Sequence, residues 1–138
     1  MQTDPTCTFC KIIKGELPSY RVYEDPKYLA FLDINPVSLG HVLVIPKNHA
    51  KDMLHSTPHD RDGLIEVVAK IAPQIMKAVG AMGFNIGINT GKDAGQIIFH
   101  THLHIIPRRS NDGLSEWKNI DVTKGELSNL AEKIRRTP

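Results

Sequence analysis

Alternating apolar and polar residues occur in several short runs along the chain, and a period of two is typical of β-strands. Asp25-Pro26-Lys27 separates the first two runs and predicts the turn of a hairpin. The third run is rich in Val and Ile, which favours a central strand. The runs span residues 19–24, 28–34, 41–46, 84–89 and 100–106. The pattern therefore predicts five strands.

A helical period replaces the strand period between residues 58 and 80. Thr57 is suited to cap this helix and Pro58 to its first position, while Gly80 predicts its end. Two apolar rows recur along it, one formed by Leu64, Val68, Ile71, Ile75 and Val79 and the other by Ile65, Ala69, Ala72 and Met76. We expect one row to cover the sheet and the other to widen that contact or to face a second subunit.

Shorter helices are predicted at residues 7–14 and 124–136. Together the elements predict an α+β fold in one domain over residues 1–138, with a five-stranded antiparallel sheet, one long helix and one short helix. The core should lie within residues 7–108, and a polar C-terminal tail should follow at 109–138. A chain of this length is large enough to bury a substantial core.

Composition and charge describe an ordinary soluble globular protein. Of the 138 residues, 41% are hydrophobic and 23% are charged, and the formal net charge is +2. This mild charge does not indicate nucleic acid or an acidic membrane as a partner. No apolar run approaches the length of a membrane span, and residues 1–5 lack the features of a signal peptide. We therefore expect a cytoplasmic protein without a membrane partner.

The strongest chemical signal is the run from His100 to Ile106, in which three histidines occupy alternate positions. On a strand their imidazoles share one face, about 6.5–7 Å apart. A single histidine would be typical of a buried core residue, but three in register favour a functional site. Two chemistries remain open from these residues, a metal site and nucleophilic attack on phosphorus by a neutral imidazole.

The two cysteines form Cys7-Thr8-Phe9-Cys10. In a reducing compartment this spacing indicates either half of a metal site or a redox pair. A thioredoxin-like redox motif follows a strand, and only six residues precede Cys7, so the redox interpretation is disfavoured. Two cysteines cannot complete a zinc site, so two further ligands would have to come from elsewhere in the chain.

Three stretches together resemble the histidine triad (HIT) superfamily of nucleotide hydrolases and transferases. The triad run with Gly95-Gln96 upstream is the first. The others are residues 31–36, read as Phe-Leu-Asp-Ile-Asn-Pro, and residues 40–49, read as Gly-His-Val-Leu-Val-Ile-Pro-Lys-Asn-His. The likeness covers residues 7–108 and implies a five-stranded antiparallel sheet with two helices, in a protein that usually forms a homodimer.

The resemblance also implies a reaction. His102 would be the nucleophile, attacking the α-phosphate of a purine nucleotide conjugate to form a nucleotidyl-phosphohistidine that water then hydrolyses. His104 would bind the phosphate or take part in proton transfer. The conjugate would be a nucleoside phosphoramidate or a dinucleoside polyphosphate. The alternative is a nucleotide-binding or scaffolding protein whose catalysis is vestigial.

Further site residues follow from the same resemblance. The Asp33 carboxylate would accept the ribose hydroxyls, with Phe31 and Ile34 lining the base pocket. Asn89, Gly95 and Gln96 match phosphate-contacting positions. The zinc ligands found in a subset of the family correspond to Cys7, Cys10, His49 and His100. A zinc ion with two sulfur and two nitrogen ligands is closed to substrate and therefore structural.

One position departs from the family pattern. Members commonly carry Ser or Thr three residues before the first histidine of the triad, where it can hydrogen-bond the leaving-group side, and this chain has Ile97 there. The ending Ile106-Pro107-Arg108 is closer to the branch that cleaves dinucleoside polyphosphates. The sequence therefore leaves the choice between phosphoramidates and dinucleoside polyphosphates open.

Overall fold

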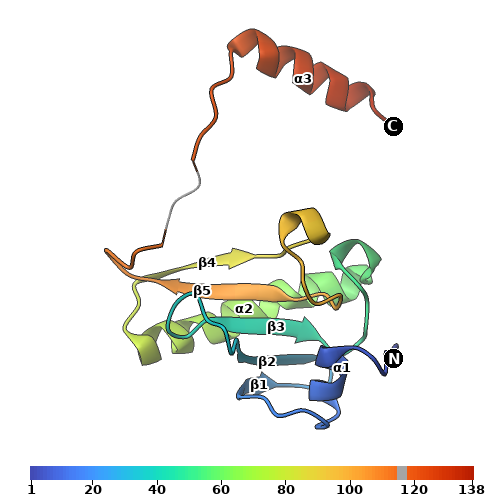
Figure 1. Cartoon of the computed structure of the whole chain (residues 1–138), viewed down its shortest axis with the longest axis vertical. Coiled ribbons are helices and arrows are strands. Elements are labelled where there is room, and N and C mark those ends of the chain that lie inside the picture. The colour runs from blue at the N-terminus through green and yellow to red at the C-terminus, as the bar shows by residue number, and fades with distance from the viewer. Residues whose placement is uncertain (115–117) are drawn as a thin grey trace.

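The computed structural model describes residues 1–114 and 118–138 and contains the predicted five-stranded antiparallel sheet (Figure 1). The strands are β1 (Arg21–Glu24), β2 (Tyr28–Leu32), β3 (Val42–Pro46), β4 (Gly83–Gly87) and β5 (Leu103–Arg108). The helices are α1 (Thr8–Ile13), α2 (Pro58–Val79) and α3 (Lys124–Arg136), and 3-10 turns lie at Met53–His55 and Lys92–Ala94. The α+β architecture is thus confirmed.

The strand order is β1-β2-β3-β5-β4, so β3 and β5 are neighbours although α2 and β4 lie between them in sequence. All four pairings are antiparallel. In this register Leu43 of β3 and Gly87 of β4 both lie opposite His104 of β5. His104, the last histidine of the triad, therefore has a neighbouring strand on each side and points to the same face of the sheet as Leu43.

The sheet has two buried faces with different covers. The long helix α2 packs on one face, against side chains that include Ala30, Val42, Val44, Leu103 and Ile105. The opposite face carries Leu29, Phe31, Leu43 and Ile45 and is covered by Cys7, Phe9, Cys10 and Ile12 of the α1 region. Because α1 is six residues long, it covers only part of this second face, and the histidines lie beside it.

The helix α2 begins and ends at the residues that the sequence predicts. The Thr57 hydroxyl accepts the Asp60 N–H at the N-terminus, and Gly80 ends the helix with φ at 70°. Within the first apolar row, Leu64, Val68, Ile71 and Ile75 are buried against the sheet. The second row is only partly used, since Ala72 is buried while Ile65 is 49% exposed and Ala69 is exposed. A strip of α2 is therefore left uncovered by its own chain.

The fifth strand begins later than the alternating pattern predicts. It starts at Leu103, so His100 and His102 lie in the segment before it, which bends at residues 98–100. This segment does not pair with a neighbouring strand among the described residues, because Thr101 forms its hydrogen bonds with the loop that follows β3. The Thr101 N–H donates to the Ala50 carbonyl at 2.9 Å, and the Thr101 hydroxyl pairs with that of Ser56 at 2.7 Å.

The helix expected near the C-terminus is present as α3, which lies apart from the sheet in Figure 1. Of the polar tail predicted at 109–138, residues 115–117 lie outside the described residues. The start of the tail is anchored, because the Arg108 guanidinium pairs with Asp112 and the Arg109 side chain donates to the Val79 carbonyl. No described helix is both long and apolar enough to span a membrane.

Candidate active site

His102 lies just before β5, with its ring in contact with those of Phe9 and His104. Its Nδ1 is 2.7 Å from the carbonyl oxygen of His100. Because a carbonyl oxygen can only accept a hydrogen bond, Nδ1 carries the ring proton and donates it. The other ring nitrogen, Nε2, therefore holds an unprotonated lone pair.

A chain of hydrogen bonds fixes the opposite tautomer in His104. The Val37 N–H donates to Nδ1 of His41 at 3.1 Å, so Nε2 of His41 carries that ring's proton. This Nε2 lies 2.8 Å from Nδ1 of His104 and donates to it. His104 must then carry its own proton on Nε2. That nitrogen is buried without a hydrogen-bond partner among the described residues, which leaves a donor for a bound ligand.

Burial keeps these imidazoles neutral. Reinforced by the neighbouring rings of His102 and His41, it lowers the pKa of His104 to about 4. Burial also lowers the pKa of His102, against the hydrogen bond to the His100 carbonyl, and lowers the pKa of His41, against the charge of Asp33. At pH 7 each ring therefore has one donor and one lone pair, and the assignment of tautomers holds.

Asp33 approaches the histidine pair from the end of β2. Its Oδ2 is 3.5 Å from Nε2 of His41, and its Oδ1 accepts the Asn35 N–H at 2.8 Å. The backbone N–H of Asp33 donates to the His41 carbonyl at 2.9 Å. The carboxylate thus closes the turn that follows β2 and also faces the site.

The Phe9 ring packs against His102, the candidate nucleophile. Its ring makes edge-on contacts with His102 at 5.2 Å, His100 at 5.9 Å and Phe31 at 5.4 Å between centroids. Phe31, expected to line a base pocket, is 4% exposed and packs with Phe9 in the core, while Ile34 is 76% exposed beyond the strand end. Of the two residues expected to line the base pocket, Phe31 is therefore buried and Ile34 is exposed to solvent.

Gln96 braces the segment that leads to the triad. Its Oε1 accepts the Gly91 N–H at 2.9 Å, and its Nε2 donates to the carbonyls of Lys51 at 2.7 Å and Ile98 at 3.1 Å. The side chain is 3% exposed. All its hydrogen-bonding groups are engaged with the backbone, so in this structure Gln96 shapes the loop rather than offering a free amide to a phosphate.

The turn before Gln96 uses its own backbone donors. The N–H groups of Ala94, Gly95 and Gln96 donate to carbonyls of residues 91 and 92. Gly95 has φ at 91°, and the nearest side-chain atom to a Cβ placed there would be Nδ2 of Asn89 at 3.5 Å. The Asn89 side chain therefore lies next to Gly95 in this loop. Ile97 is 85% exposed next to it.

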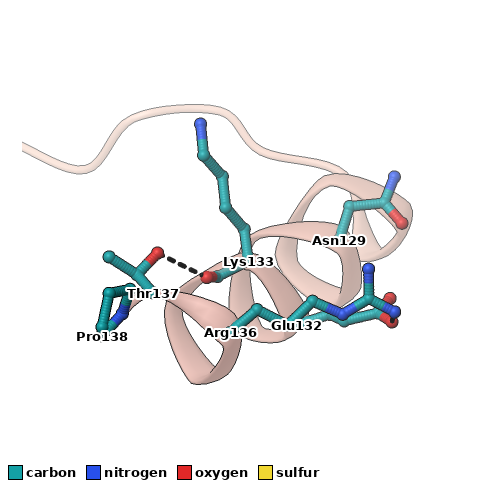
Figure 2. A pocket seen from close by; sticks show the side chains of 6 residues that line it. All are labelled: Asn129, Glu132, Lys133, Arg136, Thr137 and Pro138. Carbon is teal, nitrogen blue, oxygen red and sulfur yellow. Dashed lines mark hydrogen bonds and ion pairs between the residues drawn. The ribbon is translucent and has the colours of Figure 1, made fainter.

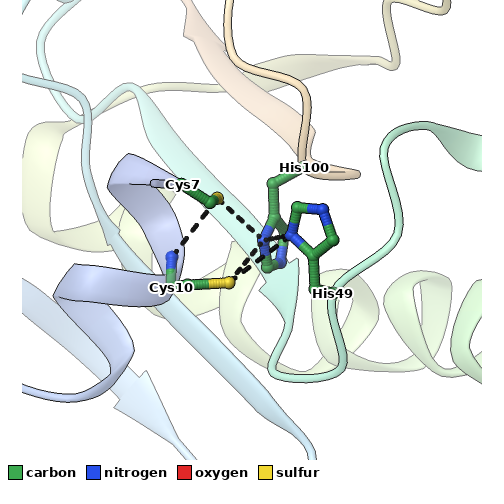
Figure 3. Close-up of side chains that lie close together, drawn as sticks. All are labelled: Cys7, Cys10, His49 and His100. Carbon is green, nitrogen blue, oxygen red and sulfur yellow. Dashed lines mark hydrogen bonds between the residues drawn. The ribbon is translucent and has the colours of Figure 1, made fainter. Parts of the chain in front are cut away.

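A second cluster joins four side chains from three separate parts of the chain (Figure 3). Nδ1 of His100 lies 3.4 Å from Cys7 Sγ and 3.7 Å from Cys10 Sγ. Nδ1 of His49 lies 3.4 Å from Cys10 Sγ and 3.2 Å from Nδ1 of His100. Tetrahedral zinc bonds would give edges of roughly 3.3–3.6 Å between such atoms. The four residues predicted as ligands therefore fit one metal ion.

The remaining ring nitrogens of the cluster support this fit. Nε2 of His100 lies 2.7 Å from the Pro46 carbonyl and donates to it, so the lone pair is on Nδ1 and points at the sulfurs. Nε2 of His49 is 3.9 Å from the Asp4 carboxylate. Burial lowers the pKa of His100 to about 4 and raises the pKa of the Cys7 thiol. The neutral ring of His100 can thus offer its Nδ1 lone pair to a metal ion, and the two cysteines would bind that ion as thiolates, losing their protons on binding.

His41 is the site residue that the sequence alone did not assign. It stands in the stretch 40–49 that resembles the HIT family, but nothing in its spacing gives it a role. Only the pairing of β3 with β5 brings its ring to His104. Because Leu43 lies opposite His104, a correct strand register would have placed His41 at the edge of the same face.

A five-stranded antiparallel sheet that presents His102 and His104 with opposite tautomers beside a Cys/His cluster defines a protein of the histidine triad class. The HIT domain family model matches residues 14–111, so the chain belongs to the HIT family. Two similar proteins have named activities. The adenylylsulfatase HINT3 of Arabidopsis thaliana is 47% identical over 94% of this chain and 68% of its own. The adenosine 5'-monophosphoramidase hnt1 of Schizosaccharomyces pombe is 38% identical over 94% and 96%.

Solved structures agree with the fold. The crystal structure of SMU.412c from Streptococcus mutans UA159 superposes with a TM-score of 0.90 at 40% identity, covering 97% of this chain and 86% of that one. A Zn-bound histidine triad family protein from Mycobacterium smegmatis has a TM-score of 0.77 at 39% identity, covering 93% and 97%.

The hydrogen-bond chain predicts a measurable pattern of ring protonation. In two-bond 1H–15N spectra at pH 7 we expect His102 to be protonated on Nδ1 and His104 on Nε2. The substitution His41→Ala removes the donor to Nδ1 of His104, so His104 should become a mixture of tautomers while His102 keeps its own. An unchanged His104 spectrum in this variant would contradict the role given to His41.

Proposed function

We propose that the protein is a nucleotidyl hydrolase that cleaves purine nucleotide conjugates at the α-phosphate through a nucleotidyl-phosphohistidine on His102. The observation that carries this proposal is the opposed pair of tautomers. The lone pair on Nε2 of His102 can attack without a base, and the N–H on Nε2 of His104 can donate to a phosphate oxygen.

The proposed reaction has two displacements. Nε2 of His102 forms a bond to the α-phosphorus while the bond from phosphorus to the leaving group breaks, and the leaving group takes a proton from water. The hydroxide left by that proton transfer then attacks the phosphorus, the bond between phosphorus and Nε2 of His102 breaks with its electron pair returning to the nitrogen, and a nucleoside monophosphate is released. Throughout, the His100 carbonyl can stabilise the positive charge that His102 gains when it attacks.

The nucleoside end of the substrate is proposed to lie beside Asp33. This carboxylate is partly exposed and next to the histidine pair, which suits hydrogen bonds from ribose hydroxyls. Phe31 and Ile34 are proposed to line the base pocket, Ile34 with an exposed side chain and Phe31 from the buried cluster that it forms with Phe9. The phosphate end is proposed to contact Asn89 and Gly95 in the loop before the triad, and also Nε2 of His104.

The relatives support an adenylyl group as the nucleotide. Adenylylsulfate and adenosine 5'-monophosphoramidate, the substrates implied by the names of the two relatives, share that group and differ in what is attached to it. Ile97 is the reason to keep the leaving group open, because an exposed apolar side chain offers no hydrogen bond where the family commonly has a hydroxyl. A substrate panel with amine, sulfate and polyphosphate leaving groups would settle this choice.

The substitution His102→Ala should lower turnover of an adenosine phosphoramidate by roughly 10³-fold or more, because the nucleophile itself is lost. In the wild-type protein, intact-mass analysis after rapid quench should show an added adenylyl group, and the variant should show none. His59→Ala is a suitable control, since His59 lies exposed on α2 and pairs with Lys27.

Unchanged turnover in the His102 variant would refute the role of this residue. The rival function, nucleotide binding without catalysis, is favoured only by Ile97. It predicts that the wild-type protein binds adenosine monophosphate but never carries a covalent adenylyl group. The quench experiment therefore separates the two functions.

We also propose that the metal ion of the Cys/His cluster is zinc with a structural role. Cys7, Cys10, His49 and His100 would hold it and leave no position for substrate. The Zn-bound protein from Mycobacterium smegmatis supports the choice of ion. The two cysteines do not form a disulfide, which supports the reducing cytoplasm as the place where the protein works.

Protein purified without added metal should contain about one zinc ion per chain by elemental analysis. Chelation should lower the melting temperature by about 5 °C or more, because a loss of 1–2 kcal/mol has roughly that effect in a domain of this size. Cys10→Ser should reproduce the shift. A melting curve indifferent to chelator, with zinc far below one per chain, would contradict the site.

A homodimer is the proposed assembly. The outer edge of β4 is unpaired among the described strands, and the uncovered strip on α2 includes Ile65. An open edge strand presents unpaired backbone N–H and C=O groups that can pair with a second chain. Sedimentation velocity at micromolar concentration should therefore give a species of twice the 15.4 kDa chain mass, and a monomer at that concentration would refute the dimer.

A further inference from the structure

His100 belongs to both side-chain clusters of the site, through two different groups. Its ring nitrogen Nδ1 lies 3.4 Å from Cys7 Sγ and 3.7 Å from Cys10 Sγ, in the cluster that fits a metal ion (Figure 3). Its backbone carbonyl accepts the proton on Nδ1 of His102 at 2.7 Å. A shift of this buried residue at the metal cluster would therefore also move the acceptor that fixes the tautomer of His102.

The two histidine rings of the metal cluster need a cation between them. Nε2 of His100 donates to the Pro46 carbonyl, which leaves the lone pair on Nδ1. Nε2 of His49 faces the Asp4 carboxylate at 3.9 Å, which favours the same tautomer in that ring. The two Nδ1 atoms are 3.2 Å apart, so their lone pairs repel each other. Without an ion these lone pairs would face only the weak S–H donors of the two cysteines, at 3.4 Å, and the cluster should spread.

The loop that carries His49 also holds the segment before β5. Three of its backbone carbonyls accept hydrogen bonds from that segment. The acceptors are Pro46, Ala50 and Lys51, and the donors are the His100 ring, the Thr101 N–H and the Gln96 amide, at 2.7, 2.9 and 2.7 Å. Because His49 lies between the first and second acceptors along the chain, a displacement of this ligand would move the acceptors as well.

The aromatic residue between the two cysteines makes a third connection. Phe9 follows Cys7, the N-cap of α1, and precedes Cys10. Its ring centroid lies 5.2 Å from that of His102 and 5.9 Å from that of His100. A movement of α1 away from the metal cluster would open these contacts. The nucleophile is thus joined to the cluster by a backbone carbonyl, by a loop and by an aromatic ring.

We propose that His100 is a positioning residue that couples the metal cluster to the nucleophile. While the cluster holds its ion, the His100 carbonyl stays on Nδ1 of His102, and the lone pair on Nε2 of His102 can attack phosphorus. When the ion is lost, His102 becomes a mixture of tautomers and the reactive fraction falls. This coupling rests on the proposed zinc ion and on the proposed nucleophile, and it gives the cluster control of the reaction as well as of stability.

Asp4 offers a way to change the affinity for the ion without touching the nucleophile. Its N–H donates to Cys10 Sγ at 3.4 Å, and its Oδ2 lies 3.9 Å from Nε2 of His49. Its Oδ1 accepts the N–H and the hydroxyl of Thr6. Among the described residues, its partners lie within residues 6–10 and at His49. Removal of a carboxylate that orients a histidine ligand commonly weakens metal binding by about 10–100-fold.

The first experiment compares Asp4→Asn with Glu132→Gln in the full chain, since both change a carboxylate to the matching amide. Glu132 is a suitable control because it pairs with Arg136 at a surface depression on α3, apart from the sheet (Figure 2). We expect Asp4→Asn to raise the dissociation constant for zinc, measured against a competing chelator, by about 10-fold or more. Glu132→Gln should leave it unchanged.

The tautomer of His102 is then followed in two-bond 1H–15N spectra as zinc is added back to metal-free protein. The Nδ1–H form should rise with zinc occupancy, and its midpoint in Asp4→Asn should be displaced by the same factor as the dissociation constant. At saturating zinc this variant should form the adenylyl adduct at the wild-type rate, because only occupancy was changed. A His102 spectrum that does not respond to zinc in folded protein would overturn the proposal.

Hydrogen exchange at half-saturating zinc distinguishes this coupling from a general loss of the fold. The Thr101 N–H, which donates to the Ala50 carbonyl, should exchange faster in proportion to the metal-free fraction. The amides of β2 and β3 pair within the sheet and should keep their protection. Equal loosening of Thr101 and of these strands would mean that the ion only holds the fold together, and the proposal would be wrong.

Failure of the proposed reaction gives a different result. A wild-type chain with one zinc ion and with His102 in the Nδ1–H form, but without an adenylyl adduct, would refute the hydrolase and leave the coupling intact. Zinc far below one ion per chain would refute the proposed zinc site and the coupling together.

Discussion

A neutral imidazole has one N–H and one lone pair, and the backbone decides in this protein which nitrogen holds which. The carbonyl of His100 keeps the proton of His102 on Nδ1, and the Val37 N–H sets His41, which in turn sets His104. As a result, Nε2 of His102 holds a lone pair while Nε2 of its neighbour His104 holds a proton. The chemistry of the site depends on these backbone contacts more than on any property of histidine itself.

Much of the fold could be predicted because it depends on local patterns. Alternation of apolar residues reflects burial on the two faces of the sheet, and the caps Thr57 and Gly80 report the ends of α2 through their own backbone preferences. The four Cys and His side chains of the metal cluster were suggested by resemblance. Cys7 and His100 are 93 residues apart, so no local rule could have brought them together.

The parts that sequence did not predict depend on contacts between distant segments. His100 was expected inside the strand, but the loop after β3 draws Thr101 out of the ladder. Gln96 matches a phosphate-contacting position of the family, and the sequence did not predict the three backbone groups that hydrogen-bond its amide. The relation of His41 to His104 exists only in the paired sheet. For Thr101 and Gln96 the deciding partners include backbone groups, and for His104 the partner is a ring nitrogen of His41; their positions are known only after folding.

The loop that follows β3 has a consequence for how this site could be transplanted. The carbonyls of Pro46, Ala50 and Lys51 accept hydrogen bonds from His100, Thr101 and Gln96 in turn. One inserted residue would displace these acceptors by about 3.4 Å, more than a hydrogen bond tolerates. The exposed side chain of Lys51 is free to vary, but the number of residues between Pro46 and Lys51 is not. A designer moving the triad into another sheet would therefore have to carry this loop across at its full length.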